Sequence, residues 1–277
     1  RGGRMIIKNL MSTDPVCIDK DQNVCDALRL MGKRDVSRLI VINTNSDHEK
    51  EMVGIVTEKD IAMKLGSSRY GNMAPSHFHV STVMTPDLVT ADSDMDAGSA
   101  ASIMLENNIG SLPVVDDDEL LGIVTKSDLL DVCRGKAYDK YTAGDVMSTE
   151  MITVTPDERL VHARRMMIDA GIGRLPVMDN QELAGILTAS DMTRAVINFR
   201  KLVPDRHKPS RIRNLLVGDV MKQNVETVDA ETPVTEIASM ILEKGYGGFP
   251  VTAEGELAGI ITKTDLLDLI VEIEGVF

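Results

Sequence analysis

One pattern occurs four times along this chain of 277 residues. Each copy opens on a methionine, and in the last three copies a Pro, a Gly and a Thr follow that Met by 29, 38 and 41 residues. In the first copy Ile40 takes the place of the Pro, and five extra residues in the next loop put Gly54 and Thr57 at 43 and 46 residues from the Met. Matches at fixed offsets indicate an internal repeat, whose units bury a core only together. The opening methionines are Met11, Met84, Met147 and Met221.

Each copy spans about 60 residues, and its pattern predicts the element order β-α-β-β-α. The short first β segments are expected at 16–18, 88–90, 152–154 and 226–228. A helix follows each of them, because apolar residues recur at helical spacing on one face. These are Val24, Ala27, Leu28 and Met31 in the first copy, Leu160, Ala163 and Met167 in the third, and Val234, Ile237 and Ile241 in the fourth. Glycines are expected to end three of these helices, at Gly110, Gly173 and Gly247.

Two strands and a second helix complete each copy. In the second copy the strands are expected at 112–115 and 121–124, with the helix starting just after Thr125. The predicted fold class is α/β (α+β). One unit of this size buries too little surface for a convincing core, so units should pair, although their spacing does not decide which pairs form. The four units, called repeats 1 to 4, are expected at residues 8–70, 80–137, 143–201 and 214–275.

The charge of the chain narrows the classes of function. Lys and Arg total 30 against 43 Asp and Glu, and a net charge of −13 repels nucleic acid and anionic membranes unless charge is locally segregated. Aromatic residues make up only 3%, too few for a base-stacking surface. No apolar run approaches the roughly 18 residues of a membrane helix, and the start lacks the apolar region of a signal peptide. Three sparse cysteines without a CxxC pair suit free thiols, so a cytoplasmic location is expected.

Two local features suggest other partners. Residues 199–213 hold six basic side chains against one acid, Asp205, and this stretch either contacts nucleic acid or polyphosphate or is a solvated linker, the reading we favour. His77 and His79 flank Phe78, but no neighbouring cluster completes a metal site, so a solvated loop is expected. No nucleophile–base set, zinc-ligand cluster or phosphate-binding glycine loop occurs. We therefore expect no catalysis, no metal and no catalytic cofactor, and we do not expect nucleic acid as a partner.

A Gly-Ile-(Val/Leu/Ile)-Thr-x-x-Asp signature ends the second hairpin strand of every repeat, and the last three repeats carry a Pro in the strand before it. On these motifs the chain resembles the CBS-domain family over residues 8 to 275. In architecture it is similar to the nucleotide-sensing gamma subunit of AMP-activated kinase. The resemblance implies two Bateman modules of paired repeats in a disc-like arrangement, with adenosine-containing ligands bound in clefts between paired repeats. It also makes a homodimer and a regulated partner protein plausible. The signatures are Gly54-Ile55-Val56-Thr57…Asp60, Gly122-Ile123-Val124-Thr125…Asp128, Gly185-Ile186-Leu187-Thr188…Asp191 and Gly259-Ile260-Ile261-Thr262…Asp265.

The Thr-x-x-Asp motif lies where a strand ends and a helix begins. A helix N-terminus suits a phosphate, the Thr hydroxyl can donate to it, and an ionised Asp can accept hydrogen bonds from both ribose hydroxyls. The alternative is a capping box that only finishes the helix, although Glu or Gln would serve such a box better than Asp. The phosphate candidates are Thr57, Thr125, Thr188 and Thr262, and the ribose candidates are Asp60, Asp128, Asp191 and Asp265.

Two arginines stand two residues before the Pro position, in repeats 1 and 3 only. Guanidinium groups bind phosphate bidentately, and in the gamma subunit an Arg at this motif position reaches nucleotide phosphates, so Arg38 and Arg174 are phosphate candidates. The alternative is an Arg at a strand edge that snorkels to solvent. Three lysines of the motifs could add charge or be ordinary surface residues: Lys59, Lys126 and Lys263.

The adenine is expected in an apolar slot near the first β segment and the Pro strand. By position its wall candidates are Val16, Leu88, Met151 and Val225, with plain core packing as the alternative. Cys17 stands where the other repeats have Thr, which puts the first site in doubt. The sequence thus predicts a regulatory sensor that binds AMP, ADP or ATP. The alternatives are an S-adenosylmethionine or methylthioadenosine binder and a nucleic-acid-binding regulator acting through residues 199–213.

Overall fold

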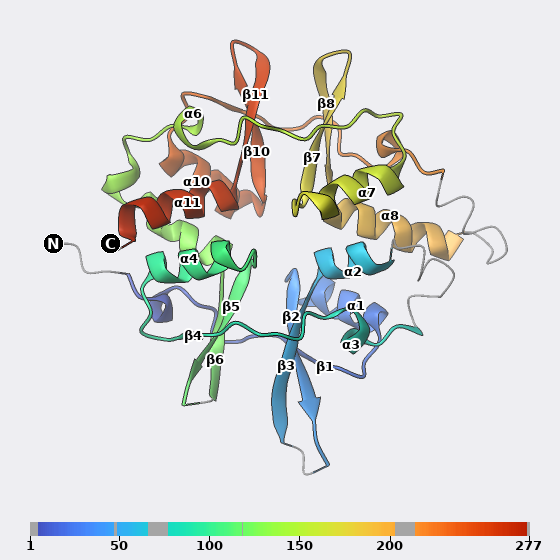
Figure 1. The fold of residues 1–277 in the computed structure, drawn as a ribbon, viewed down its shortest axis with the longest axis vertical. Helices are drawn as coiled ribbons and strands as arrows, with labels where there is room; N and C mark the ends of the chain where they lie inside the picture. Colours follow the sequence, from blue (N-terminus) through green and yellow to red (C-terminus); the bar gives the residue numbers. More distant parts are fainter. Residues whose placement is uncertain (1–4, 47–48, 66–76, 118, 203–213, 276–277) are drawn as a thin grey trace. The chain divides into compact units, whose positions relative to one another are not determined.

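The computed structural model describes residues 5–46, 49–65, 77–117, 119–202 and 214–275 (Figure 1). Repeat 1 contains β1 (Cys17–Asp19), α1 (Val24–Arg34), β2 (Arg38–Thr44), β3 (Lys50–Thr57) and α2 (Glu58–Leu65). Repeat 2 contains β4 (Ala91–Asp92), α4 (Ala97–Glu106), β5 (Ser111–Asp116), β6 (Glu119–Thr125) and α5 (Lys126–Leu129), which continues as the 3₁₀ helix η3 (Leu130–Arg134). Repeat 3 contains α7 (Leu160–Asp169), β7 (Arg174–Asp179), β8 (Glu182–Thr188) and α8 (Ala189–Leu202). Repeat 4 contains β9 (Val228–Asp229), α10 (Val234–Lys244), β10 (Gly248–Ala253), β11 (Glu256–Thr262) and α11 (Lys263–Glu274).

The α/β class and the repeated element order are confirmed, but the first strand of repeat 2, β4, lies directly after the segment expected at 88–90. In repeats 1, 2 and 4 the first strand pairs in parallel with the next strand, which pairs in antiparallel with the hairpin partner, as in the order β1-β2-β3. Repeat 3 differs, because its expected first strand is a single bridge between Val154 and Val177 beside the hairpin β7-β8. Pro156 explains the loss: Lys20 and Ala230 at the equivalent position donate their N–H to the central strand, and proline has no N–H to donate.

The predicted apolar faces of the helices are confirmed. The side chains of Leu160, Ala163 and Met167 are the buried ones of α7, as their spacing predicts. In α1 and α10 the predicted face is also buried, except that Leu28 is only partly so. Burial of this face, more than intrinsic helix propensity, stabilises helices of this length.

The glycines expected to end the helices do not do so, and that prediction is wrong. The backbone turns left-handed two residues earlier in every repeat, at a position where Gly, Asn and Asp are the residues that commonly tolerate the conformation. Gly245 takes this role as the C-cap of α10, with φ of 66°. The equivalent residues are Asp35 (φ 53°), Asn108 (φ 50°) and Gly171 (φ 67°).

The chain forms two compact units, each built from alternate repeats. Unit 1 comprises Arg1–Asp14, Val89–Met151 and Val225–Phe277, and unit 2 comprises Pro15–Leu88 and Ile152–Asn224. Unit 1 therefore holds the bodies of repeats 2 and 4, whose helices α4 and α11 lie against each other (Figure 1). Unit 2 holds the bodies of repeats 1 and 3, with α2 against α8 (Figure 1).

Each repeat's opening segment, defined as the opening Met and the next three residues, lies on the signature strand of the neighbouring repeat. Ser12 of repeat 1 exchanges two backbone hydrogen bonds with Ile123 of repeat 2, at 2.9 and 3.0 Å. The same bridge joins Thr85 to Ile55, Ser148 to Ile260, and Lys222 to Ile186. The signature glycine makes this approach possible, because a Cβ on Gly122 would lie 2.4 Å from the carbonyl oxygen of Ser12. Consecutive repeats thus exchange their openings, within each unit as defined above.

The two units differ in how their two repeats are joined. Unit 1 has one continuous apolar core that includes Leu112 and Met104 of repeat 2 and Phe249 and Ile270 of repeat 4. Among the side chains that the structure describes, unit 2 has two apolar clusters, one around Leu39 and the other around Leu175. The described contacts between the repeats of unit 2 include Met63 of repeat 1, which packs against the cluster of repeat 3, and a hydrogen bond from Ser190 to Glu58.

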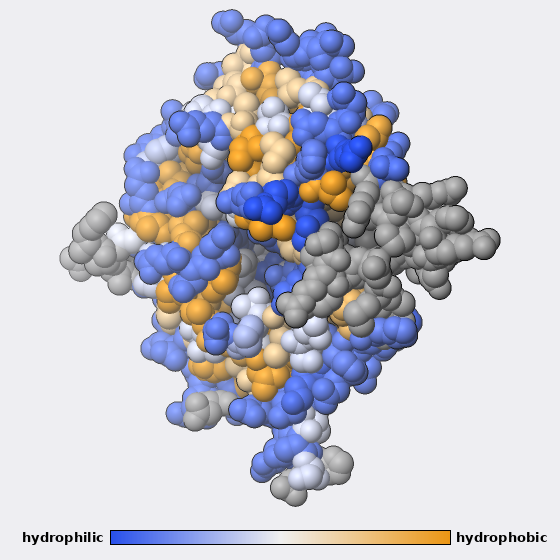
Figure 2. Space-filling view, turned by 45° about the vertical axis from the view of Figure 1, so that its right-hand side comes forward, coloured by the Kyte–Doolittle hydropathy of each residue, from blue (hydrophilic) through white to orange (hydrophobic). Residues whose placement is uncertain are grey.

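The exterior carries both hydrophilic and apolar residues (Figure 2). Hydrophilic residues cover much of the face in Figure 2, and apolar residues lie in patches between them. None of the helices in the described ranges combines the length and the apolarity that a bilayer crossing requires. The three cysteines are free thiols, and Cys133 is buried.

Candidate functional site

The four Thr-x-x-Asp motifs all form capping boxes at strand-to-helix junctions. At the start of α11 the backbone N–H and the hydroxyl of Thr262 both donate to Oδ2 of Asp265, at 2.7 Å each. Thr57 donates in the same way to Asp60, at 2.9 and 2.7 Å. The backbone N–H groups of Thr125 and Thr188 donate to Oδ2 of Asp128 and Asp191 at 2.7 and 3.3 Å. The capping alternative is therefore the observed geometry at all four junctions.

The use of Asp in place of Glu does not distinguish a binding motif from a cap. Thr142 and Asp145, which follow no signature strand, form the same box at the start of α6 (Ala143–Val146), with bonds of 2.9 and 3.0 Å to Oδ2. The hydrogen bonds from the backbone and then the side chain of Thr142 lower the pKa of Asp145. Asp closes a capping box here outside the signature motifs, so our argument from residue type was wrong.

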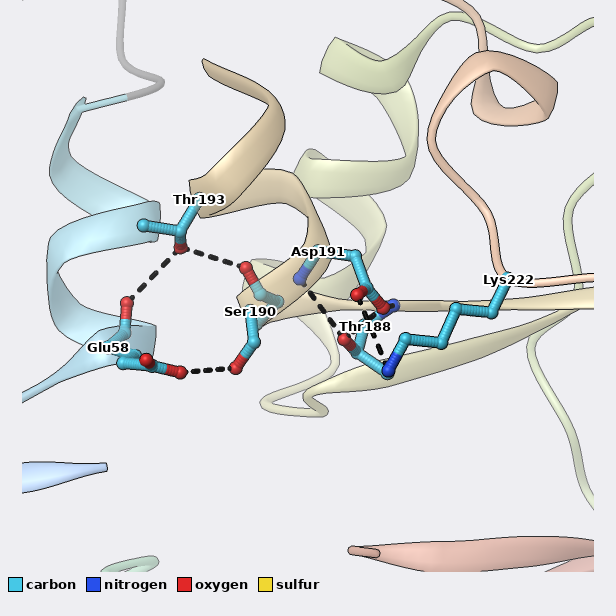
Figure 3. A network of polar contacts seen from close by, with 7 residues as sticks. Glu58, Thr188, Ser190, Asp191, Thr193 and Lys222 are labelled. Atoms are coloured by element: carbon cyan, nitrogen blue, oxygen red, sulfur yellow. Dashed lines mark hydrogen bonds and ion pairs between the residues drawn. The ribbon is translucent and has the colours of Figure 1, made fainter. Parts of the chain in front are cut away.

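Capping occupies only one oxygen of each carboxylate. In two junctions the other oxygen, Oδ1, meets the opening segment of the neighbouring repeat. Ser148 donates to Oδ1 of Asp265 at 2.6 Å. The Nζ of Lys222 lies 3.6 Å from Oδ1 of Asp191 (Figure 3). For Asp60 and Asp128 we find no hydrogen bond to the second oxygen within the described ranges.

A polar network joins the two junctions of unit 2 (Figure 3). Glu58, at the start of α2, accepts a hydrogen bond of 2.7 Å from the hydroxyl of Ser190 on α8. The hydroxyl of Thr193 is 2.9 Å from the carbonyl of Ala189 and 3.4 Å from that of Glu58. Asp191 and Thr193 are buried. The network places the N-termini of α2 and α8, with Asp60 and Asp191, in one region of unit 2.

The two arginines lie opposite motif threonines across their hairpins. Arg38 pairs with Thr57 in the antiparallel register, and Arg174 pairs with Thr188. Both are half-buried and both belong to unit 2. At the equivalent positions of unit 1, Ser111 and Gly248 pair with Thr125 and Thr262. The structure therefore places both candidate phosphate arginines in the same unit, at the motif end of the sheets.

The motif lysines contact the other repeat of their unit. In unit 1 Lys126 donates to the Thr264 hydroxyl at 2.9 Å, and Lys263 donates to the Ser127 hydroxyl at 2.6 Å. This pair of contacts is reciprocal, since each Lys reaches the residue that follows the other Lys. In unit 2 Lys59 donates to the carbonyl of Gly171 at 3.2 Å. These lysines therefore join repeats, which their sequence positions alone did not indicate.

The four adenine-wall candidates are half-buried and lie outside the fully buried core. Val16 borders the apolar cluster of repeat 1, and its carbonyl accepts a hydrogen bond of 3.0 Å from Ile40. Val16 and Leu88 belong to unit 2, and Met151 and Val225 to unit 1. Cys17 follows Val16 in the chain, and its thiol lies 3.6 Å from the carbonyl of Pro15. Partial exposure leaves these side chains able to contact a ligand, and their role stays a prediction.

A cavity of about 490 Å³ in unit 1 adjoins one junction. Its volume falls in the range of small-molecule sites. Asp265 lines it together with Asp145, Asp268 and Glu272, against one basic residue, Lys140. Four carboxylates repel a phosphate chain, so this cavity favours a neutral or cationic group.

The features set aside in the sequence fall partly within the described residues. A ring nitrogen of His79 lies 2.7 Å from the carbonyl of Asp21, and no group of three or more potential metal ligands occurs in the described ranges. Most of the basic stretch 199–213 lies outside the described residues, so its interpretation as a linker or a contact site stays a prediction.

Sequence reasoning missed the residues directly after the opening methionines. Two of them, Ser148 and Lys222, meet the second oxygen of a motif Asp, and their equivalents are Ser12 and Thr85. The signal was present, because three of these four residues carry a hydroxyl at the same offset. Its meaning required knowing that each opening lies on the neighbouring repeat.

The CBS domain family model matches residues 7–67, 80–135, 143–198 and 217–272. The chain therefore belongs to the CBS-domain family. It is 27% identical over 256 residues to the uncharacterized protein MJ1225 of Methanocaldococcus jannaschii, a match that covers 87% of this chain and 90% of that protein. The crystal structure of MJ1225, described as a candidate archaeal homologue of γ-AMPK, is similar with a TM-score of 0.82 and 26% identity, over 96% of this chain and 99% of that one.

Two further structures are similar to this chain. An uncharacterized conserved protein from Pyrococcus horikoshii shares the fold, with a TM-score of 0.65 and 22% identity over 96% of this chain and 100% of that one. CBSX2, crystallised in complex with AMP, covers 48% of this chain and 98% of its own, with a TM-score of 0.41 and 27% identity. The AMP complex is a property of CBSX2.

Proposed function

We propose that this protein is a regulatory sensor that binds adenine nucleotides (AMP, ADP or ATP) at its strand-to-helix junctions. One observation carries the proposal. Each motif Asp caps its helix through Oδ2 alone, and Oδ1 of Asp265 and of Asp191 already holds a hydroxyl or an ammonium group. An oxygen that binds such donors from the protein is suited to bind ribose hydroxyls in their place.

The junction would contact the ribose and the phosphate of a nucleotide through different groups. The ribose hydroxyls donate to the Asp carboxylate, which keeps its capping bond. The phosphate accepts from the helix N-terminus and from the guanidinium of the same repeat, since Arg174 starts β7 opposite Thr188. Unit 2, which holds both arginines, is accordingly the preferred unit for phosphorylated ligands.

Regulation follows from the exchanged openings. A ribose that takes Oδ1 of Asp265 displaces Ser148, whose segment belongs to the neighbouring repeat. Ligand binding therefore changes a contact between consecutive repeats. A partner protein can respond only if the ligand has different affinities for the two arrangements. We expect such a protein to act without catalysis, in the cytoplasm, alone or as a homodimer.

A second candidate function is binding of S-adenosylmethionine or methylthioadenosine. The acid-lined cavity beside Asp265 favours it, because a sulfonium cation is attracted where a phosphate is repelled. This alternative concerns unit 1, whose hairpins carry Ser111 and Gly248 where unit 2 carries arginines. The nucleic-acid alternative rests on residues 199–213, most of which lie outside the described residues, and it stays a prediction.

Calorimetric titration with AMP, ADP, ATP, S-adenosylmethionine and NAD tests the proposal. We expect at least one of the first three to bind below the millimolar range, and Asp191→Ala combined with Arg174→Ala to weaken it. Asp219→Ala is the control, because it removes a capping bond outside the motifs, which the backbone N–H of Leu216 donates to Oδ2 of Asp219 at 3.0 Å. If S-adenosylmethionine binds and no phosphorylated nucleoside does, the second candidate replaces the first. If the control weakens binding as much as the double variant, the junctions serve as caps only.

A further inference from the structure

The opening of repeat 4 departs from the other three at one residue. Lys222 stands directly after the opening Met, where Ser12, Thr85 and Ser148 carry hydroxyls. Its backbone is held in the same bridge as theirs, with hydrogen bonds of 2.9 Å in both directions to Ile186. The lysine side chain therefore starts from the place that corresponds to Ser148, and it reaches the equivalent carboxylate (Figure 3).

The carboxylate that Lys222 meets is the most enclosed of the four. Asp191 is 8% exposed, whereas the other three motif aspartates are half-buried. Its Oδ2 accepts from Thr188, and its Oδ1 lies 3.6 Å from the Nζ of Lys222. A ribose hydroxyl that binds Oδ1 competes with the ammonium for that oxygen and weakens the ion pair. The ammonium can move away, because the Lys222 side chain is 59% exposed and a pair this open is weak.

The consequence depends on the charge of the ligand. A neutral nucleoside weakens the pairing of the ammonium with the carboxylate and offers the ammonium no new anion. A phosphorylated nucleoside offers phosphate oxygens, to which an ammonium forms strong charge-assisted hydrogen bonds. At Asp265 the displaced group is the neutral Ser148 hydroxyl, so no such penalty arises there.

We propose that Lys222 is a specificity-determining residue, which makes the Asp191 junction prefer adenosyl ligands that carry a negative charge over neutral ones. This inference rests on the proposed function, since it needs the junctions to bind adenosyl ligands. It adds that the four junctions are not equivalent. The one that faces Lys222 selects for phosphate, and the one that faces Ser148 does not select in this way.

Methionine methyl NMR can follow each junction separately. The Sδ of Met221 lies beside Gly185 in repeat 3, and the Sδ of Met147 lies beside Gly259 in repeat 4, so each opening Met reports on its own junction. The full chain, labelled with methyl-¹³C methionine, is titrated with AMP and separately with adenosine. The measured quantity is the ratio of the two dissociation constants, adenosine over AMP, at each methyl group.

At Met221 we expect a ratio of at least about 10 in the wild type, because AMP offers the displaced ammonium a new anionic partner and adenosine offers it none. Lys222→Ser should lower this ratio at least about fivefold and leave the ratio at Met147 unchanged. The reciprocal variant Ser148→Lys should raise the ratio at Met147. Ser148 and Lys222 are both exposed, so neither substitution removes a core side chain. The methyl spectrum recorded without ligand shows whether each variant keeps the wild-type fold.

The outcomes separate this inference from the function on which it rests. An unchanged ratio at Met221 in Lys222→Ser, with both ligands binding, overturns the role of Lys222 and leaves the proposed function standing. If Met147 responds to ligand but Met221 responds in neither the wild type nor Lys222→Ser, the role of Lys222 is also overturned. If neither ligand shifts any opening methionine, the proposed function itself is refuted.

Discussion

Substitution of the signature glycine Gly122 by Ala tests the exchange of openings. The new Cβ would lie 2.4 Å from the carbonyl oxygen of Ser12 and 3.1 Å from the Sδ of Met11. The first of these is a backbone atom that is itself hydrogen-bonded to Ile123, so the opening of repeat 1 must move. Two backbone hydrogen bonds at about 1 kcal/mol each and a packing strain of roughly 1–3 kcal/mol give an expected destabilisation of about 3–5 kcal/mol.

Urea unfolding followed by circular dichroism measures this destabilisation, and hydrogen exchange locates it. We expect faster exchange at the amides of Ser12 and Ile123, which the bridge protects in the wild type. Gly173→Ala is the matched control, because a Cβ there meets no atom within 4 Å. The control should unfold within about 0.5 kcal/mol of the wild type. An unfolding midpoint unchanged in Gly122→Ala, together with unchanged exchange at Ser12, would refute the reasoning.

The remaining predictions concern the stability of helix α1, the order in which the cysteines react and the dependence of stability on pH. Gly32→Ala, in α1 with no atom within 4 Å of the new Cβ, should raise the free energy of unfolding by about 0.5–1 kcal/mol in the same urea assay, and a loss of stability would contradict this. Iodoacetamide at neutral pH should modify Cys17 and Cys25 well before Cys133, because burial raises the pKa of the Cys133 thiol to about 12, and mass spectrometry of the labelled peptides decides the order. Burial also raises the pKa of Tyr138, so both groups must stay protonated in the fold. Their folded-state pKa values lie above the unfolded ones, so their contribution to stability is full below about pH 9 and falls as the pH rises toward 12. Cys133→Val should flatten that alkaline loss, and an equal slope in both proteins would exclude the thiol as its source.

Much of the fold could be predicted, because a pattern that is weak evidence in one copy occurs here four times. Helical faces such as Leu160, Ala163 and Met167 followed from spacing alone, and so did the class of the fold. The helix ends could not be placed from glycine, since Asp35 and Asn108 take the left-handed turn as readily as Gly245. The first strand of repeat 3 is reduced to a single bridge because Pro156 has no N–H to donate. This could not be predicted, because it depends on which strand would have accepted the hydrogen bond.

The residue types of the candidate site could be proposed from the sequence, but the residues that contact them could not. The Thr-x-x-Asp motif identified the junctions, and the structure adds that a cap and a second donor can share one carboxylate through different oxygens. Contacts such as Ser148 with Asp265 join residues that are 117 positions apart in the chain. No local pattern indicates such a contact, because it depends on which repeat receives each opening.

The exchanged openings also bear on how such a chain can be cut or duplicated. A gene fragment that holds repeat 2 alone would keep Ile123 but lose Ser12, and its signature strand would present an unpaired edge. A lone copy inserted elsewhere would meet the same deficit. Two consecutive copies supply each other's openings, but the apolar core of unit 1 needs repeats 2 and 4 together, so the unit of inheritance best suited to this architecture is all four copies.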